Sequence, residues 1–229
     1  MLGQHGRGLT KALLTRPALA MARVGITPNM LTVVGTVLSV GVAVATLPQG
    51  RFIMGPPLLG VVLIGDSFDG ILARATGRSS VFGAFLDSTL DRLADGAIFA
   101  SLAAWAALSM KTDSAFLHVA TVCLALACVV LAAVVPYARA RAESIGATAS
   151  VGIAERTDRL VVALVATFVV ALGATFIVGL GAPQWVLSAA LGYVALASFI
   201  TVVQRIVVVS RQMAGRAIAA DGVEQETSV

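Results

Sequence analysis

The chain has 229 residues, of which 58% are hydrophobic and only 12% carry a charge. A soluble globular domain contains about a quarter charged residues, so this composition excludes a soluble enzyme and a soluble basic module that binds nucleic acid. The formal net charge of +4 instead suits a protein that sits among anionic membrane lipids.

The first 26 residues mix leucines with basic side chains at short intervals. The basic residues are Arg7, Lys11, Arg16 and Arg23. A segment this polar does not span a bilayer. We predict that residues 1–26 form an amphipathic helix on the membrane surface.

Six later apolar runs are each long enough to cross a bilayer. Their approximate limits are 29–47, 57–76, 81–109, 115–136, 159–181 and 184–204. We therefore predict an all-α, polytopic membrane protein with six transmembrane helices in one domain, residues 27–212. The polar residues 213–229 are predicted to form a flexible tail.

Basic residues are distributed unevenly between the two ends of these spans. With a cytoplasmic N-terminus, 13 of the 16 lysines and arginines fall on the cytoplasmic side, while Arg51 and Lys111 fall outside and Arg92 lies within a span. This is the positive-inside pattern. It predicts a multi-pass protein of the plasma membrane, in contact with membrane lipids, with both termini and the functional site on the cytoplasmic side.

The first span begins with a sequence that suits a helix start. Thr27 is a good N-cap, and Pro28 fits the first turn. Free backbone N–H groups and the positive dipole end at such a position favour an anion such as a pyrophosphate. Asn29 and Thr32, three residues apart, would add side-chain donors; a simple helix cap is the alternative interpretation.

Four aspartates, Asp66, Asp69, Asp87 and Asp91, lie on the second and third spans. At about 100° per residue, each pair shares one helix face, so the two pairs can face each other. A carboxylate at membrane depth costs roughly 2.5–3.5 kcal/mol, and four together repel unless cations or protons lie between them. Oxygen ligands suit Mg²⁺ or Mn²⁺, and two such ions would balance the charge. Scattered helix-end aspartates or a proton relay are the alternatives.

The spacing Asp66-x2-Asp69-Gly70-x2-Ala73-Arg74-x8-Gly83-x3-Asp87-x3-Asp91 resembles the full signature of the CDP-alcohol phosphotransferase family. The resemblance covers about residues 6–212. It implies two divalent metals on the four aspartates, CDP-diacylglycerol as the donor, and Asp91 as the general base. The residues implied to bind the CDP-lipid are Asn29, Thr32, Asp66, Asp69, Gly70, Ala73, Arg74, Gly83 and Asp87. Asp95 continues the aspartate stripe outside the signature, and we predict that it is a structural partner of Arg92.

Arginines stand at the cytoplasmic ends of the last three spans. If Arg139, Arg159 and Arg205 converge on one cavity, they would bind a phosphate dianion through forked hydrogen bonds. Such a site would select a phosphorylated acceptor over a plain alcohol. Membrane topology and headgroup binding are the alternative roles of these arginines.

Two further segments, 136–143 and 152–160, resemble one group within the family, the actinobacterial phosphatidylinositol phosphate synthases. This likeness implies inositol 1-phosphate as the acceptor, bound by Arg139, Arg159 and Arg205, with Arg156 as a further candidate, and it implies a homodimer. Glycerol 3-phosphate is the alternative acceptor. A divalent-cation or proton transporter is the alternative class, but the second half of the chain holds no inverted repeat of the aspartates.

Overall fold

The computed structural model describes residues 23, 25–77, 79–176 and 184–226. Over those residues the chain is all-helical, as predicted. The helices are α2 (Pro28–Thr46), α3 (Gly55–Ala75), α4 (Val81–Leu108), α5 (Ala115–Ser144), α6 (Arg156–Phe176) and α7 (Gln184–Glu226). The amphipathic helix predicted for residues 1–26 lies almost entirely outside the described residues.

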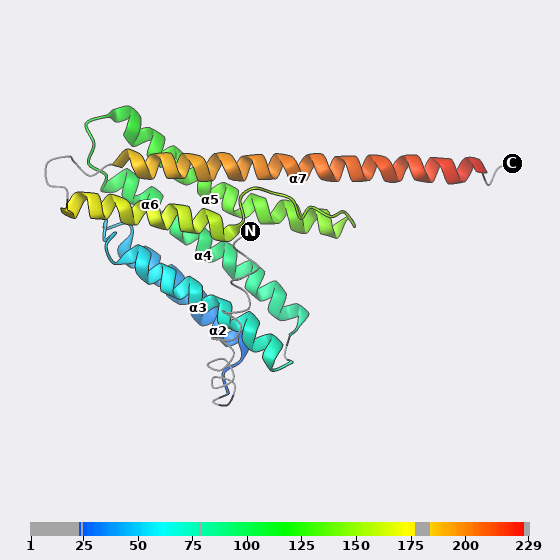
Figure 1. Ribbon diagram of the computed structural model, residues 1–229, viewed down its shortest axis with the longest axis horizontal. Coiled ribbons are helices and arrows are strands. Elements are labelled where there is room, and N and C mark those ends of the chain that lie inside the picture. The colour runs from blue at the N-terminus through cyan, green and yellow to red at the C-terminus, as the bar shows by residue number, and fades with distance from the viewer. Residues whose placement is uncertain (1–22, 24, 78, 177–183, 227–229) are drawn as a thin grey trace.

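The helices form two groups that α4 holds together. α2 packs on both α3 and α4, while α5 packs on α4 and α7. α6 packs on α7 and touches α3, which closes the bundle on the other side. In Figure 1, α2 and α3 lie together below α6, and α7 extends far beyond the rest of the bundle.

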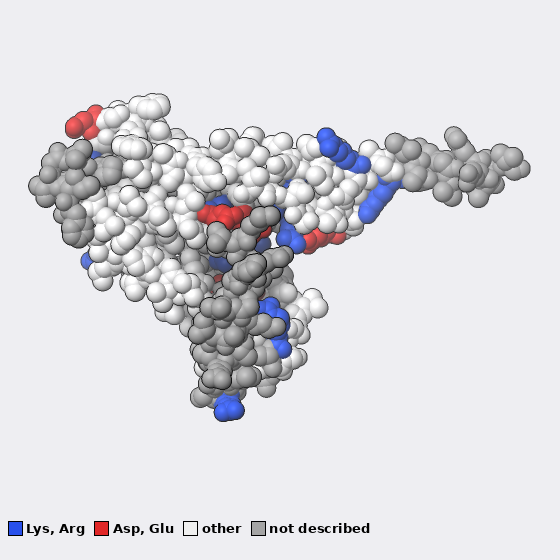
Figure 2. Space-filling view, in the orientation of Figure 1, with Lys and Arg blue, Asp and Glu red and all other residues white. Residues whose placement is uncertain are grey.

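Four of the helices, α2, α3, α5 and α7, are long and apolar enough to cross a membrane. α4 and α6 have 28 and 21 residues, but both carry several charged side chains near their N-terminal ends. The structure therefore supports a membrane protein, and the six predicted spans correspond to six long helices of which four meet this criterion. Figure 2 shows a mostly uncharged face, with charged side chains gathered toward its middle.

Helix starts follow the predicted capping chemistry. The Thr27 hydroxyl accepts a hydrogen bond from the Met30 N–H at 3.3 Å, with Pro28 at the first helical position of α2. Ser80 caps α4 in the same way, since its hydroxyl accepts from the Gly83 N–H at 2.9 Å. Both caps satisfy donors that a helix leaves free, and they fix where α2 and α4 begin beside each other.

Two helices extend beyond the predicted spans. α5 includes Pro136 and continues to Ser144, because one missing N–H does not end a helix whose neighbours hold it. α7 continues to Glu226, so much of the predicted tail is helical. Its extension contacts the α5–α6 connection: the Gln212 side chain both accepts from the Thr148 N–H and donates to the Thr148 carbonyl, at 2.9 and 2.7 Å. The flexibility of residues 213–229 stays a prediction.

Candidate functional site

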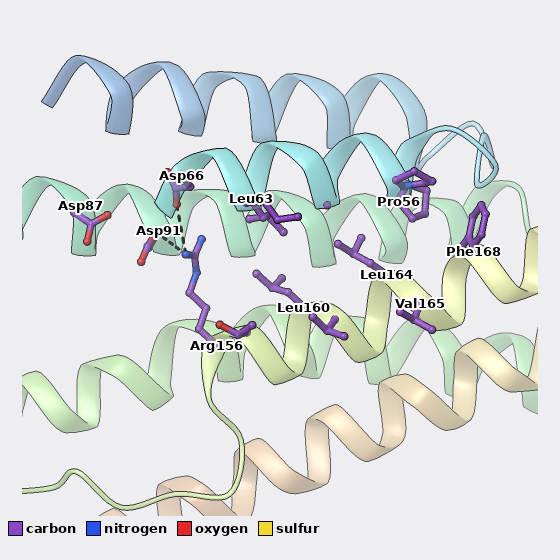
Figure 3. Close-up of a pocket in the computed structure, with 15 residues that line it drawn as sticks. Pro56, Leu63, Asp66, Asp87, Asp91, Arg156, Leu160, Leu164, Val165 and Phe168 are labelled. Atoms are coloured by element: carbon purple, nitrogen blue, oxygen red, sulfur yellow. Dashed lines mark ion pairs between the residues drawn. The ribbon is translucent and has the colours of Figure 1, made fainter. Parts of the chain in front are cut away.

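Three of the four predicted aspartates meet between α3 and α4. Asp66 from α3 and Asp87 and Asp91 from α4 each offer one carboxylate oxygen, and these oxygens lie within 4.8 Å of one another. Figure 3 shows the three side chains at one end of a groove. The side chain of Asp69 lies outside the described residues. The helical phase worked out from the sequence therefore brings together the three aspartates that can be placed.

Asp66 is reached closely by α2, which the sequence analysis did not anticipate. A Cβ atom on Gly35 would lie only 2.9 Å from Asp66 Oδ1, closer than real Cβ contacts come. Gly35 therefore leaves the room that the Asp66 carboxylate occupies. The only sequence feature that could have predicted this contact is a glycine three residues after Thr32, within the first predicted span.

Arg156, the first residue of α6, extends into the aspartate cluster. Its Nη1 lies 2.8 Å from Asp91 Oδ1 and 3.7 Å from Asp66 Oδ2, as the dashed lines in Figure 3 show. Its Nε donates to Asp95 Oδ1 at 2.9 Å. The sequence predicts Arg156 only as an acceptor arginine, yet its guanidinium also supplies positive charge to the clustered carboxylates.

The predicted partner of Asp95 is wrong. Asp95 pairs with Arg156 and with Arg159, whose Nη2 lies 3.7 Å from Asp95 Oδ2. Arg92 instead lies 3.6 Å from Asp91. A buried carboxylate is stable only when a cation lies close to it. Here the two nearest cations are Arg156 and Arg159, which both come from the first turn of α6.

An apolar groove of about 650 Å³ leads away from the aspartates. Its walls come from α3, through residues such as Leu63 and Ile64, and from α6, through Leu160, Leu164 and Phe168. Asp66, Asp87, Asp91 and Arg156 line its charged end. The groove thus joins apolar surface to a charged site, as an amphiphilic ligand requires.

A second, smaller cavity of about 180 Å³ collects most of the remaining signature residues. The predicted CDP-lipid residues that line it are Asn29, Thr32, Gly70, Ala73, Arg74, Gly83 and Asp87. A Cβ on Gly83 would lie 3.1 Å from Asn29 Oδ1, and one on Gly70 would lie 3.6 Å from the Arg74 guanidinium. Gly83 therefore leaves room beside Asn29, whereas a Cβ on Gly70 would make an ordinary contact with Arg74.

The four predicted acceptor arginines line a third cavity, of about 340 Å³. Arg159 is only 4% exposed, and its Nε and Nη1 find no hydrogen-bond partner among the described residues. Arg205 donates to the carbonyls of Val151 and Val135. Arg139 is more exposed and bonds to Glu143 at 2.9 Å. Buried guanidinium donors without partners point to an anionic ligand.

Known proteins resemble this chain over most of its length. Residues 25–194 match the family described as CDP-alcohol phosphatidyltransferase. A phosphatidylinositol phosphate synthase of Cutibacterium acnes is 41% identical over 211 residues, which cover 91% of this chain and 97% of the relative.

Two crystal structures of the Mycobacterium tuberculosis phosphatidylinositol phosphate synthase share the fold. The one with CDP-DAG bound has a TM-score of 0.75 at 36% identity and covers 86% of this chain and 94% of that one. The one in complex with manganese and citrate has a TM-score of 0.74 at 36% identity and covers 86% and 88%.

Proposed function

Because this chain belongs to the CDP-alcohol phosphatidyltransferase family, we propose that it transfers the phosphatidyl group of CDP-diacylglycerol to inositol 1-phosphate. The products are phosphatidylinositol phosphate and CMP. The relatives named for this reaction cover nearly the whole chain, and a related structure is described with CDP-DAG bound.

The observation that carries the proposal is that Asp91 and Arg156 line both the apolar groove and the arginine cavity. A lipid donor in the groove and a phosphorylated acceptor in the arginine cavity would therefore meet at these two residues. Holding two reactants in contact is a large part of catalysis. We place the transferred phosphate at this junction.

The donor spans two of the cavities. Its acyl chains lie along Leu63, Leu160, Leu164 and Phe168 in the groove, whose open side lets a lipid enter from the bilayer. Its nucleotide lies in the cavity lined by Asn29, Thr32, Gly70, Ala73, Arg74 and Gly83. Asp66 and Asp87 stand between the two ends of the donor and so near its pyrophosphate.

The aspartate cluster fits divalent cations. Three carboxylate oxygens within 4.8 Å of one another form the all-oxygen donor set that Mg²⁺ and Mn²⁺ prefer, and Arg156 already supplies a cation at its edge. Asp66, Asp69, Asp87 and Asp91 would hold two ions. When bound, these ions neutralise the pyrophosphate oxygens and the charge that develops on the leaving CMP.

Asp91 acts as the general base. It accepts the proton of the attacking inositol hydroxyl while a new bond forms between that oxygen and the β-phosphorus of the donor. The bond from the β-phosphorus to the bridging oxygen breaks, and CMP leaves with the electron pair. Arg156, 2.8 Å from Asp91, places positive charge beside the reacting phosphate.

Arginines select the acceptor. Arg159, whose buried Nε and Nη1 have no hydrogen-bond partner in the described part of the chain, binds the inositol phosphate with Arg139, Arg156 and Arg205. A plain alcohol such as inositol leaves these donors unsatisfied, which is costly in a buried site. We also propose that the site opens to the cytoplasmic side of the plasma membrane; the homodimer stays a prediction.

A comparison of three acceptors tests the proposal. Purified protein in detergent receives CDP-diacylglycerol, Mg²⁺ and one of inositol 1-phosphate, glycerol 3-phosphate or inositol, and CMP release is measured. We expect release with inositol 1-phosphate and little with the others. Preference for glycerol 3-phosphate would make the chain a phosphatidylglycerophosphate synthase, and no release with any acceptor would favour a transporter.

A further inference from the structure

We propose that Asp95 is a positioning residue for the acceptor site, which sets the spacing and orientation of Arg156 and Arg159. The inference rests on the proposed function and deepens it. Asp95 lies outside the signature, and it lines the arginine cavity beside Arg156 and Arg159, through which we assign it its role.

Asp95 is one of the most deeply buried charged groups among the described residues. Its side chain is 3% exposed, against 17% for Asp91 one turn earlier on α4. A carboxylate buried to this extent persists only with close cationic partners. Both partners come from the first turn of α6, so Asp95 ties the start of α6 to α4.

Each carboxylate oxygen of Asp95 faces a different arginine. Oδ1 accepts from Arg156 Nε at 2.9 Å, and Oδ2 lies 3.7 Å from Arg159 Nη2. A single rigid carboxylate therefore fixes how far apart the two guanidinium groups stand. These are two of the four arginines that line the acceptor cavity.

The contacts also leave specific nitrogens for other partners. Arg156 is held through Nε, so its Nη1 reaches Asp91 at the junction. Arg159 is approached through Nη2, so its Nε and Nη1 are left without partners among the described residues. The planar guanidinium is rigid, so Arg159 Nε and Nη1 point in fixed directions, each as a separate donor for an anionic ligand.

Without the negative charge of Asp95, the ion pairs of Arg156 would be those with Asp91 and Asp66. Arg156 would shift toward the aspartate cluster, and Arg159 would lose its ion pair with α4. Acceptor binding should weaken, while the donor groove and the nucleotide cavity keep their lining residues. A role confined to stability predicts no such separation between the two substrates.

Steady-state CMP release tests the proposal in the full-length protein with CDP-diacylglycerol, Mg²⁺ and inositol 1-phosphate. The variants are Asp95→Asn, Asp95→Glu, Arg156→Gln and the double variant Asp95→Asn/Arg156→Gln, with the exposed loop residue changed in Asp113→Asn as the control. For Asp95→Asn we expect the KM for inositol 1-phosphate to rise about tenfold or more and the KM for CDP-diacylglycerol to change less than about twofold. Asp95→Asn should raise the acceptor KM by a smaller factor in the Arg156→Gln background than in the wild type, because part of its effect passes through Arg156.

An unchanged acceptor KM in folded Asp95→Asn, equal rises in both KM values, or increases that multiply would overturn the proposal. If Asp95→Asn does not fold, Asp95→Glu decides, because it keeps the charge but displaces both arginines by one methylene. A raised acceptor KM then supports the proposal, and an unchanged one rejects it. Failure of the wild-type protein to use inositol 1-phosphate would instead reject the proposed acceptor.

Discussion

Arg156 Nη1 lies 2.8 Å from Asp91 Oδ1, at the point where the apolar groove meets the arginine cavity. Asp91 comes from the middle of α4, and Arg156 is the first residue of α6. The pair therefore joins the aspartates that the signature provides to the arginines that the second half of the chain provides. Chemistry between a lipid and a phosphorylated alcohol would take place at this contact.

The first prediction concerns the general base. Asp91→Asn should lower kcat for CMP release by roughly 10²–10⁴, the usual contribution of a positioned proton acceptor. Arg156 should still occupy the junction, because Asp66 and Asp95 remain as its partners. Turnover near the wild-type rate would remove Asp91 from this role; the exposed Asp113→Asn serves as the control.

A second prediction addresses Gly35. Gly35→Ala adds a Cβ 2.9 Å from Asp66 Oδ1, so the Asp66 carboxylate must shift from its position in the cluster. We expect weaker Mn²⁺ binding, measured by titration of the purified protein without substrate. Gly41→Ala on the same helix meets nothing within 4 Å and should bind Mn²⁺ as the wild type does. Equal affinities in both variants would contradict a role for Gly35 in placing Asp66.

Whether the apolar groove binds the acyl chains of the donor can be tested by placing a large side chain in it. Val165 is 55% exposed and lines the groove, whereas Val169 is 42% exposed and lies one turn further along α6 outside that lining. A tryptophan at position 165 takes space that an acyl chain would use. Val165→Trp should raise the KM for long-chain CDP-diacylglycerol but leave the KM for inositol 1-phosphate unchanged. A similar rise in Val169→Trp would show that the groove does not hold the donor.

Arg159 gives the sharpest test of acceptor binding. A hydrogen bond to a charged group contributes about 1.5–3 kcal/mol, so Arg159→Gln should raise the KM for inositol 1-phosphate roughly 10- to 100-fold. Arg159→Lys should not restore it, because lysine lacks the planar fork. Arg51→Gln, in the turn between α2 and α3, is the control. An unchanged acceptor KM in Arg159→Gln would remove this residue from the acceptor site.

Helical periodicity accounts for what the sequence predicted well. Long apolar runs predicted the bounds of α2, α3 and α4 to within two residues, whereas α5 and α7 continue past their predicted ends. The i, i+4 spacing of Asp87 and Asp91 put both on the face that meets Asp66. Local patterns do not show how helices far apart in sequence approach each other. The pairing of Asp95 with Arg156 spans 61 residues, and only the packing of α6 on α3 and α7 brings the two together.

The sequence also does not predict how closely two helices approach each other. The contact between Gly35 and Asp66 depends on how near α2 comes to α3, and a small residue alone does not predict it. Arg156 lies between the aspartates and the other arginines because it is the first residue of α6. The helix begins at Arg156 rather than at the predicted residue 159, because the charged first turn is still helical.

The most direct test of the central claim is the metal dependence of phosphatidyl transfer. Purified protein is freed of metal with EDTA, given CDP-diacylglycerol and inositol 1-phosphate, and then titrated with Mg²⁺ while CMP and the lipid product are both measured. We predict no turnover before Mg²⁺ is added, and equal amounts of CMP and phosphatidylinositol phosphate afterwards. Transfer that continues in EDTA, or CMP released without a matching lipid product, would contradict the account.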